Sequence, residues 1–405
     1  MRVQRAADTA VAKARAGDAP ATDLAHDARA VTQAGRKTFL VAGARPNFMK
    51  VAPLWFAMAA EPAHFAPRLV HAGQHYDPLL SDVFLRDLEL PRPHIALGVG
   101  SGTHAQQTAG IMVAFERACL EARPDLVVVV GDVNSTLACA LAAAKLGIPI
   151  AHVEAGLRSF DRSMPEEINR VVTDALSTYL FTPSRDADEN LRHEGIDGSR
   201  IHRVGNVMID SLLRWLPRIS GLRAHAAYGL SPGGYAVLTL HRPSNVDRQS
   251  GLGEILAALE EIQRRLPVVF PLHPRTRKSL AASGLAEGLR RMAGVIATEP
   301  LGYLEFLSLV QGARFVMTDS GGVQEETTVL GVPCLTLREA TERPITISEG
   351  TNQLVKPVRD AIIEKALEVL HGPPARPRAP ELWDGRSAER IVQILAGAPA
   401  GRAVP

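Results

Sequence analysis

From Lys37 onward, short apolar and β-branched runs alternate with longer segments of helical periodicity. Several of these runs, such as DLVVVVGD at residues 125–132, are apolar throughout instead of alternating with polar positions. A strand that is buried on both faces has this composition, and such strands form parallel sheets covered by helices. We expect helices at 135–146, 166–176 and 252–265, among others, and strands at 38–42, 68–72, 126–130, 149–153, 179–182, 235–240, 267–272, 295–298, 314–318 and 334–337.

A turn-rich segment, GLSPGGY at residues 229–235, interrupts this alternation, and both halves of the chain repeat the order strand, turn, helix. The length of 405 residues also exceeds that of most single domains. The sequence therefore predicts an α/β fold of two Rossmann-like, doubly wound domains. We expect them at residues 37–208 and 209–382, after a poorly ordered extension at residues 1–36.

Charge and composition exclude several classes of function. Lys and Arg (45) nearly balance Asp and Glu (43), so the net charge of +2 provides no basic surface for nucleic acid or an anionic membrane. No apolar run approaches the roughly 20 residues that cross a bilayer, and residues 1–36 lack the apolar core of a secretory signal. The cysteines, Cys119, Cys139 and Cys334, lack metal-ligand spacing, so we expect buried thiols in a cytoplasmic protein.

Polar residues cluster where the expected strands end. Such clusters begin at residues 43, 131 and 154 in the first half and at residues 241, 273 and 319 in the second. In open α/β sheets, ligands bind in the crevice outside the carboxyl ends of the strands. Two domains with polar strand ends therefore indicate one shared central cleft.

Two of these clusters suit an anionic ligand. In DSGGVQEE (319–326), a Ser-Gly-Gly turn precedes a helix whose free N–H groups favour a phosphate, and Glu326 follows one turn later, where a carboxylate can hold ribose hydroxyls. In GARPNFMK (43–50), Arg45 lies on the loop after the first strand and Lys50 on the next helix, and two such cations suit a diphosphate. The alternatives are an ordinary helix start and solvated surface cations.

A set of acidic residues follows the middle strands of the first half: Asp132, Glu154, Glu166 and Glu167, with Asp161 nearby. Asp132 and Glu154 each follow an apolar strand, and we expect partial burial to raise the pKa of both carboxyl groups toward values useful in acid–base catalysis. Alternatively, Glu166 and Glu167 only favour the dipole of the helix they begin, and Asp132 only caps the next helix.

Two histidines, His241 and His273, end strands at equivalent positions of the second half, and each is followed by Arg and Pro within a few residues. A single histidine at such a place is usually structural, whereas two at equivalent positions of a cleft indicate contact with a ligand. Neither has further His, Asp or Glu residues at metal-ligand spacing, so we expect no metal.

These segments, in this order, resemble the non-hydrolysing UDP-N-acetylglucosamine 2-epimerase family. The matching runs extend from Lys37 to about Leu395 and are GARPNFMKVAPL, GQHYD, GDVNSTLA, HVEAGLRS, MPEEINR, GNVMID, LTLHRP, TDSGGVQEE, TERP and WDGRSAERI. The resemblance implies a fold like that of the GT-B glycosyltransferases, in which a C-terminal helix at about residues 383–397 completes the first domain. We also expect a homodimer.

The resemblance further implies that UDP-N-acetylglucosamine (UDP-GlcNAc) and UDP-N-acetylmannosamine (UDP-ManNAc) are interconverted without NAD, metal or another cofactor. Anti elimination of UDP would give a 2-acetamidoglucal, to which UDP re-adds. The family's catalytic residues match Asp132, Glu154, Glu166 and His241, and an active-site lysine matches Lys50. The family's UDP contacts match Arg45, His273, Phe306, Ser320, Gly321, Gly322, Glu326 and Arg343.

The chain also departs from the family pattern. Asn47 stands where Glu is frequent, and Pro243 and Ser244 replace a frequent Arg-Glu pair beside His241. Gln74 matches part of a second, regulatory UDP-GlcNAc site, but Gly110 replaces an arginine of that site and Asp77 replaces a polar residue. We therefore expect no strong activation by substrate.

Four other functions stay open at this point. A hydrolysing 2-epimerase shares the fold but releases free ManNAc and UDP, and an epimerase of a related UDP-N-acetylamino sugar would use the same cleft. The several acids disfavour a GT-B glycosyltransferase, which does not need them, and together with His241 they disfavour a catalytically silent nucleotide-sugar binder.

Overall fold

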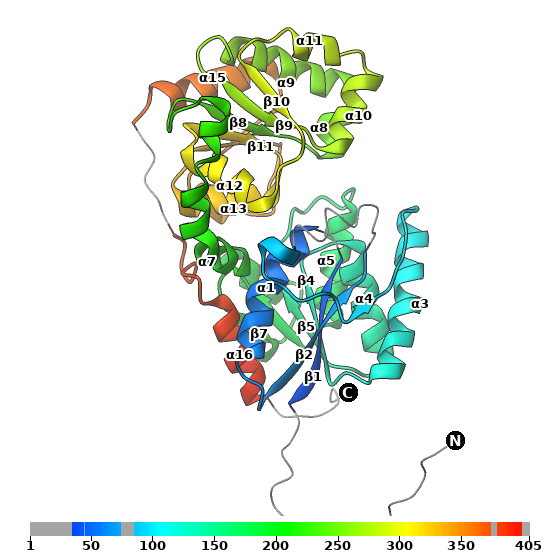
Figure 1. Ribbon diagram of the computed structural model, residues 1–405. Coiled ribbons are helices and arrows are strands. Elements are labelled where there is room, and N and C mark those ends of the chain that lie inside the picture. Colours follow the sequence, from blue (N-terminus) through cyan, green and yellow to red (C-terminus); the bar gives the residue numbers. More distant parts are fainter. Residues whose placement is uncertain (1–34, 44, 74–84, 374–378, 399–405) are drawn as a thin grey trace, which may run out of the picture.

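The computed structural model describes residues 35–43, 45–73, 85–373 and 379–398, so nearly all of the expected extension at residues 1–36 lies outside the described residues. The described chain forms two α/β domains, one above the other in Figure 1. The predicted fold class, two doubly wound parallel sheets in a GT-B-like arrangement, is confirmed.

The first sheet has seven described strands in the order β3-β2-β1-β4-β5-β6-β7, and every neighbouring pair is parallel. The chain starts in the middle at β1 and reverses direction between β1 and β4, as doubly wound sheets do. The strands are β1 (Arg36–Ala42), β2 (Phe65–His71), β3 (Ile95–Ala96), β4 (Leu126–Val130), β5 (Ile150–Val153), β6 (Tyr179–Thr182) and β7 (Ile201–Arg203).

The second sheet repeats this plan with six described strands in the order β10-β9-β8-β11-β12-β13, again all parallel. Its reversal lies between β8 and β11. The strands are β8 (Ala236–Thr239), β9 (Val268–Pro271), β10 (Val295–Thr298), β11 (Phe315–Thr318), β12 (Cys334–Leu337) and β13 (Asn352–Val355). All ten expected strands are present, and β3, β7 and β13 are additional.

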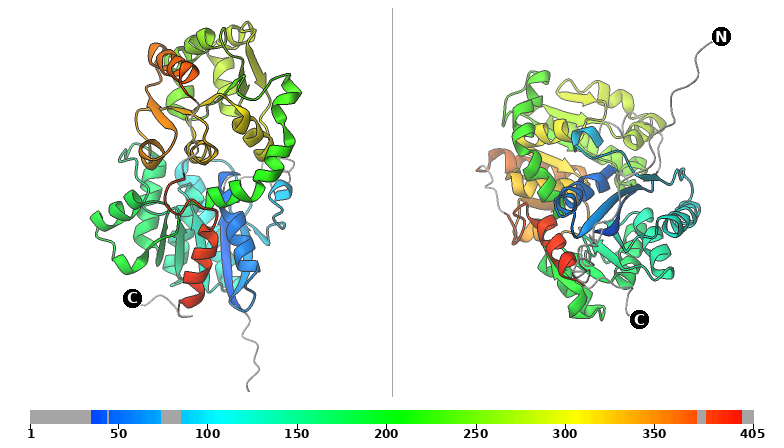
Figure 2. Two further views of the ribbon diagram at one scale, coloured as in Figure 1. Left: turned by 90° about the vertical axis from the view of Figure 1, so that its left-hand side faces the viewer. Right: turned by 60° about the horizontal axis from the view of Figure 1, so that its bottom comes forward.

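Helices cover both sheets on both faces (Figures 1 and 2). In the first domain they are α1 (Arg45–Ala59), α3 (His104–Ala122), α4 (Asn134–Lys145), α5 (Pro165–Leu176), α6 (Arg185–His193) and the short η1 (Gly198–Arg200). Along the chain, α7 (Val207–Leu222) and η2 (Ala224–Tyr228) come between the last strand of the first sheet and the first strand of the second. The helices of the second domain are α8 (Pro243–Val246), α9 (Gln249–Ile262), α10 (Pro274–Ala282), α11 (Ala286–Arg290), α12 (Tyr303–Gly312), α13 (Gly321–Leu330), α14 (Ile345–Ser348) and α15 (Arg359–His371). The last helix of the described chain is α16 (Ser387–Gly397).

Strand β4 shows why its sequence is apolar throughout. Val127 and Val129 pack into the cluster that contains α3 and α4 residues, whereas Val128 and Val130 pack into the cluster on the other face with α1, α7 and α16. All four side chains are buried. The strand therefore belongs to two cores at once, as expected for a central parallel strand.

The C-terminal helix α16 returns to the first domain and lies beside α1, as both views in Figure 2 show. Trp383 and Ile391 are buried in the same cluster as α1 and α7, and the Trp383 indole N–H donates to Pro183 O at 2.9 Å. The Asp210 carboxylate on α7 accepts from the backbone N–H groups of Ser387 and Ala388 at 3.1 and 2.7 Å. These contacts satisfy two of the free N–H groups at the start of α16.

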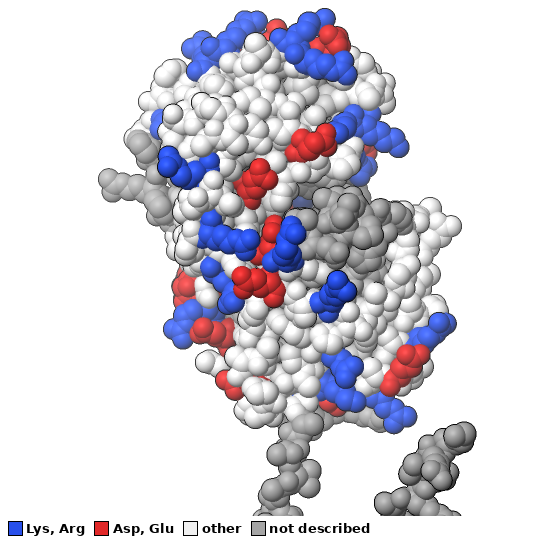
Figure 3. All heavy atoms as spheres, in the orientation of Figure 1, with Lys and Arg blue, Asp and Glu red and all other residues white. Residues whose placement is uncertain are grey.

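Charged side chains of both signs lie on the face of the molecule drawn in Figure 3. On the face in Figure 3, basic and acidic side chains are interspersed over both domains. Among the described helices, none combines the length and apolar character that a bilayer span requires. Cys119, Cys139 and Cys334 are free and buried, as predicted, and burial raises the pKa of each thiol.

Candidate active site

Arg343 joins the two domains where the strand ends of the two sheets meet. It lies on the segment after β12, and its guanidinium reaches Glu154, which follows β5 of the first domain, at 2.6 Å. The same guanidinium contacts Glu325 of α13 at 2.6 Å and its neighbour Glu342 at 2.5 Å. Lys50 of α1 forms an ion pair with the other oxygen of Glu154. All five side chains are buried, so this cluster lies in the interior where the two domains meet.

Arg170 of α5 forms a second group beside this cluster. Its guanidinium contacts Asp132 at 2.5 Å and Glu167 at 2.6 Å, and it lies 3.9 Å from Glu342 of the second domain. The side chain of Arg170 is almost fully buried. Because buried charges are tolerated only with partners, the acids of the first domain and the arginines of both domains stabilise each other.

Glu342 is surrounded by arginines. Arg242 and Arg338 contact its carboxylate at 3.1 and 2.7 Å, in addition to Arg343. Burial opposes ionisation of Glu342, but the charges of Arg343, Arg242 and Arg338 hold its pKa well below the usual range. Glu342 is thus a permanent anion that fixes the positions of the cations.

Glu154 has an unusual backbone conformation. Its φ of 74° lies in the left-handed region, which costs a residue other than glycine on the order of 1–3 kcal/mol. The N–H groups of Glu154 and Ala155 both donate to Phe181 O, at 3.0 and 3.1 Å. This turn directs the Glu154 carboxylate to Lys50 and Arg343, so strain is retained at a residue predicted to be catalytic.

The expectation that burial raises the pKa of Asp132 is wrong. Burial does oppose ionisation, but the charges of Arg170, Lys50 and Arg343 outweigh it and lower the pKa. Nor is Asp132 the cap of α4, whose N-cap residue is Val133. Asp132 is therefore an ionised carboxylate at the end of β4, with Arg170 as its direct partner.

The structure separates the two acids at the start of α5. The Glu167 carboxylate accepts from the backbone N–H groups of Ser159 and Phe160, both at 2.9 Å, and pairs with Arg170, so it organises the loop before the helix. Glu166 is half-buried, and none of the described side chains pairs with its carboxylate. Asp161 is exposed and accepts from Ser163 within its own turn, away from the ion cluster.

The two predicted histidines lie side by side, with ring centroids 5.7 Å apart. His241 Nδ1 lies 3.1 Å from Oδ1 of Asp319, a buried residue that directly follows β11. His273 is exposed, and its Nδ1 accepts from Arg275 N at 3.2 Å as the N-cap of α10. The structure thus brings both rings to the same wall of the cleft.

The predicted phosphate segment forms the start of α13. Ser320 is its N-cap residue, and Gly321 and Gly322 form its first turn. A side chain at Gly321 would lie 2.5 Å from Arg343 Nη1, so the glycine lets the guanidinium approach the helix start. Glu326 lies one turn on and is buried; burial and the charge of Glu325 raise its pKa to about 8, against an opposing effect of Tyr303.

The remaining predicted residues are placed as follows. Arg45 is the first residue of α1 instead of a loop residue, and Phe306 lies half-buried on α12. Gln74 and Asp77 lie outside the described residues. Asn47 is buried and ties the loop after β1 to β4, because its side chain accepts from Gly43 N at 3.1 Å and donates to Val130 O at 3.2 Å.

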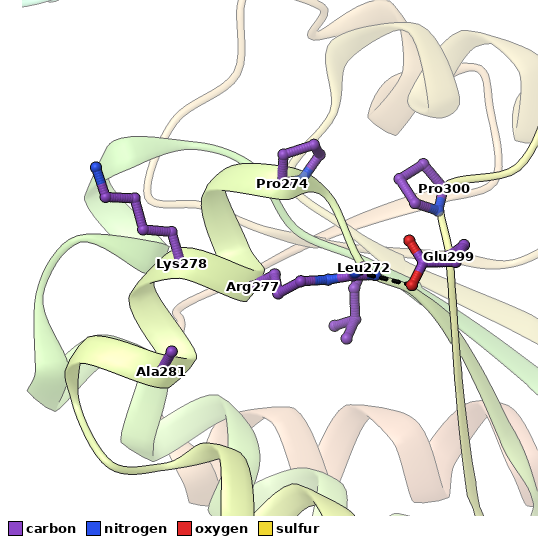
Figure 4. Close-up of a pocket in the computed structure, with 7 residues that line it drawn as sticks. All are labelled: Leu272, Pro274, Arg277, Lys278, Ala281, Glu299 and Pro300. Atoms are coloured by element: carbon purple, nitrogen blue, oxygen red, sulfur yellow. Dashed lines mark ion pairs between the residues drawn. The ribbon is translucent and has the colours of Figure 1, made fainter. Parts of the chain in front are cut away.

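A cavity of about 300 Å³ lies next to this region, between α10 and the segment after β10 (Figure 4). Arg277 and Glu299 in its wall form an ion pair at 2.7 Å. Its lining residues are Leu272, Pro274, Arg277, Lys278, Ala281, Glu299 and Pro300, so it adjoins His273 but contains no predicted site residue. We therefore base the site on the ion cluster and not on this cavity.

Sequence reasoning missed the partners of the predicted residues, above all Arg170, Asp319, Glu325 and Glu342. Asp319 and Glu325 lie inside DSGGVQEE, and Glu342 precedes Arg343 in TERP, so the motifs contained them. Arg170 ends the matching run MPEEINR, four residues after Glu166. The contacts join residues far apart in the sequence, and only the fold brings them together.

Comparison with known proteins provides independent evidence on the family of the chain. The profile of the family described as UDP-N-acetylglucosamine 2-epimerase matches residues 57–396. A UDP-N-acetylglucosamine 2-epimerase of Methanocaldococcus jannaschii is 43% identical over 364 residues, which are 89% of this chain and 98% of that protein. A UDP-2,3-diacetamido-2,3-dideoxy-D-glucuronate 2-epimerase of Pseudomonas aeruginosa is 42% identical over 364 residues, covering 89% of this chain and 99% of that protein.

A solved structure is similar over the same range. The crystal structure of the M. jannaschii UDP-GlcNAc 2-epimerase in complex with UDP-GlcNAc and UDP superposes with a TM-score of 0.83 at 42% identity. The match covers 89% of this chain and all of that one. The similarity therefore includes both domains and the cleft between them.

Proposed function

The chain belongs to the UDP-N-acetylglucosamine 2-epimerase family of isomerases, and we propose that it interconverts UDP-GlcNAc and UDP-ManNAc. The reaction proceeds by anti elimination of UDP to a 2-acetamidoglucal and re-addition of UDP after C2 is protonated on the other face. It is carried out by the side chains of the cleft. The observation that carries the proposal is the buried cluster in which Arg343 and Lys50 hold Glu154 while Arg170 holds Asp132.

The chemistry needs such a cluster because the C2 proton of the sugar is not acidified by a carbonyl group. Loss of this proton becomes feasible when it is coupled to departure of the diphosphate. The groups that favour departure of an anion are the free N–H groups of α13 and the cation Arg343, and the family resemblance adds Arg45 and His273. These groups form the diphosphate side of the proposed site.

The two proton transfers require two groups, because inversion delivers the proton to the face opposite to its removal. The lowered pKa of Asp132 leaves its carboxylate ionised in the free protein, so it can begin only as a proton acceptor, and in the reverse reaction the same group returns the proton. Glu166, whose carboxylate pairs with no described side chain, and His241, whose ring is partly exposed, complete the set of candidates. We assign Glu326 and Phe306 to contacts with UDP, as the family resemblance implies.

The test is to incubate the protein with UDP-GlcNAc in heavy water and to follow the sugar by proton NMR. We expect deuterium at C2 and both UDP-sugars at equilibrium. Free ManNAc with UDP would establish the hydrolysing reaction instead. If neither exchange nor product appears, the substrate assignment is wrong.

The candidate residues are tested with Asp132→Asn, Glu166→Gln and His241→Asn. Each should lower kcat by about 10²-fold or more, while UDP still binds in calorimetry, because the exchanged groups act on protons and not on the nucleotide. Glu260→Gln on the exposed face of α9 is the control and should keep full activity. Near-wild-type turnover in any of the three would remove that residue from the mechanism.

A second substrate has direct support, since the relative that is 42% identical acts on UDP-2,3-diacetamido-2,3-dideoxy-D-glucuronate. The same NMR experiment with that sugar in a parallel tube decides between them by the ratio of the two values of kcat/KM. A larger value for the diacetamido sugar would reassign the substrate and leave the reaction unchanged. The cytoplasmic location, the homodimer and the absence of substrate activation stay predictions.

A further inference from the structure

We propose that Asp319 is a positioning residue that fixes the ring of His241, so that Nδ1 carries the proton and Nε2 faces the cleft with its lone pair. The inference rests on the proposed function only for its effect on turnover. The arrangement of the ring is a property of the free protein and is testable without substrate.

The contact geometry assigns both nitrogens of the ring. Asp319 Oδ1 lies 3.1 Å from His241 Nδ1, and because an ionised carboxylate only accepts, this contact favours the proton on this nitrogen. His241 Nε2 has no hydrogen-bond partner among the described residues, and 40% of the side chain is exposed. A neutral imidazole held in this way presents a free lone pair at Nε2 to whatever enters the cleft.

Asp319 is itself held firmly. It is buried without exposed surface, and its carboxylate accepts from the backbone N–H groups of His241 and Arg242 at 3.1 and 3.0 Å and from Asn245 Nδ2 at 3.2 Å. Burial opposes ionisation, but the His241 ring and the backbone N–H groups of Arg242 and His241 lower the pKa of Asp319. The Asp319 carboxylate is therefore an ionised group in a fixed position, and the His241 ring contacts it there.

A purely structural role would need only the backbone contacts. The N–H groups of His241 and Arg242 shape the turn between β8 and α8, and any fixed acceptor at position 319 could serve them. The contact to Nδ1 is separate, since the ring could turn away without breaking the turn. It orients the ring that Asp319 and His273 flank on two sides.

Asp319→Asn separates the two roles. The amide oxygen can still accept from the backbone, whereas the amide N–H₂ group donates to Nδ1 and forces the ring proton onto Nε2. Asn245→Ala is the matched control, because Asn245 contacts the same carboxylate and the same turn but not the ring.

The measurement is the long-range ¹H–¹⁵N spectrum of the His241 ring in substrate-free protein, assigned by comparison with His241→Asn, together with kcat and KM. Wild type and Asn245→Ala should show the Nδ1–H tautomer, and Asp319→Asn should show the Nε2–H tautomer. In Asp319→Asn we also expect kcat to fall about 10²-fold while KM changes little. An Nε2–H tautomer in the wild-type protein would overturn the proposal even if neither Asp319→Asn nor Asn245→Ala folds. Full kcat in Asp319→Asn would overturn it too, and a protein inactive on every UDP-sugar would still report the tautomer.

Discussion

The two walls of the cleft bury carboxyl groups in different surroundings. On the wall of the first domain, Asp132 lies against Arg170, and the cations Lys50 and Arg343 are near enough to act on it. On the wall of the second domain, Glu326 is buried in α13 and forms no ion pair with a described residue. Burial opposes the charged form in both cases, yet the pKa of Asp132 falls and that of Glu326 rises to about 8.

For Asp132 the nearby cations outweigh burial, whereas Glu326 has no such cation and burial decides the sign of its shift. The two domains also differ in the charge that these carboxyl groups carry at neutral pH. The first domain keeps negative charge at neutral pH, where a proton acceptor is needed. The second domain keeps Glu326 neutral one turn beyond the helix start that we assign to the diphosphate, so this side chain adds no negative charge there.

The largest effect is expected from removing the cation that links the walls. Arg343→Met leaves Glu154, Glu325 and Glu342 without their common partner, and breaking a buried ion pair from one side costs about 3–5 kcal/mol. We expect a loss of that order in urea unfolding and a fall in kcat of about 10²-fold or more, since Glu154 is released as well. Arg264→Met, which removes an exposed ion pair of α9, should change unfolding by less than about 1 kcal/mol. A stable, active Arg343→Met protein would mean that the walls do not depend on each other.

An intermediate effect should appear in the pH dependence of stability. Glu326 keeps its proton up to about pH 8 in the folded chain but loses it near 4.5 when unfolded, so the folded state binds more protons between these values. Stability contributed by this group is fully present below pH 4.5 and falls as pH rises through 8. Glu326→Gln stays neutral throughout, so from pH 5 to pH 9 its free energy of unfolding should rise relative to wild type by a few kcal/mol.

Urea unfolding of substrate-free protein at several pH values measures this difference. The control is Glu364→Gln at an exposed position of α15. The free energy of unfolding of this variant should run parallel to that of the wild type at every pH. Parallel curves for wild type and Glu326→Gln would show that Glu326 is ionised, and the contrast between the walls would then disappear.

How far the sequence leads can be judged from the same two walls. The apolar runs located the ten strands that carry the cleft, because strands buried on both faces are distinctive. They did not reveal β3 and β7, which have two and three residues, or β13, whose central Gln353 and Leu354 are exposed. Short strands near a sheet edge bury too little to leave a continuous apolar pattern.

The site residues, too, could be predicted from the sequence only in part. The residues at strand ends, such as Asp132, Glu154 and His241, were found because their position alone marks them. The sign of the Asp132 shift was predicted wrongly, because Arg170 reaches it from another helix, 38 residues away. Cross-domain pairs such as Arg343 with Glu154, separated by 189 residues, depend on how the domains face each other, which no local pattern contains.

The smallest effect tests whether the second wall sets the position of Arg343. A methyl group added at Gly321 would lie 2.5 Å from Arg343 Nη1 and 2.8 Å from Cζ, so the guanidinium must move although three carboxylates hold it. Gly321→Ala should therefore destabilise the free protein by about 1–3 kcal/mol, the usual cost of overpacking. At Gly322 the added carbon meets only Met208 Cε, at 3.4 Å, and Ala favours a helix over Gly by up to about 1 kcal/mol, so Gly322→Ala should keep or slightly raise stability. Thermal unfolding of the two variants in the absence of ligand compares neighbouring residues of one helix turn. Equal stabilities would show that the guanidinium moves aside without cost, and that the start of α13 does not set the position of Arg343.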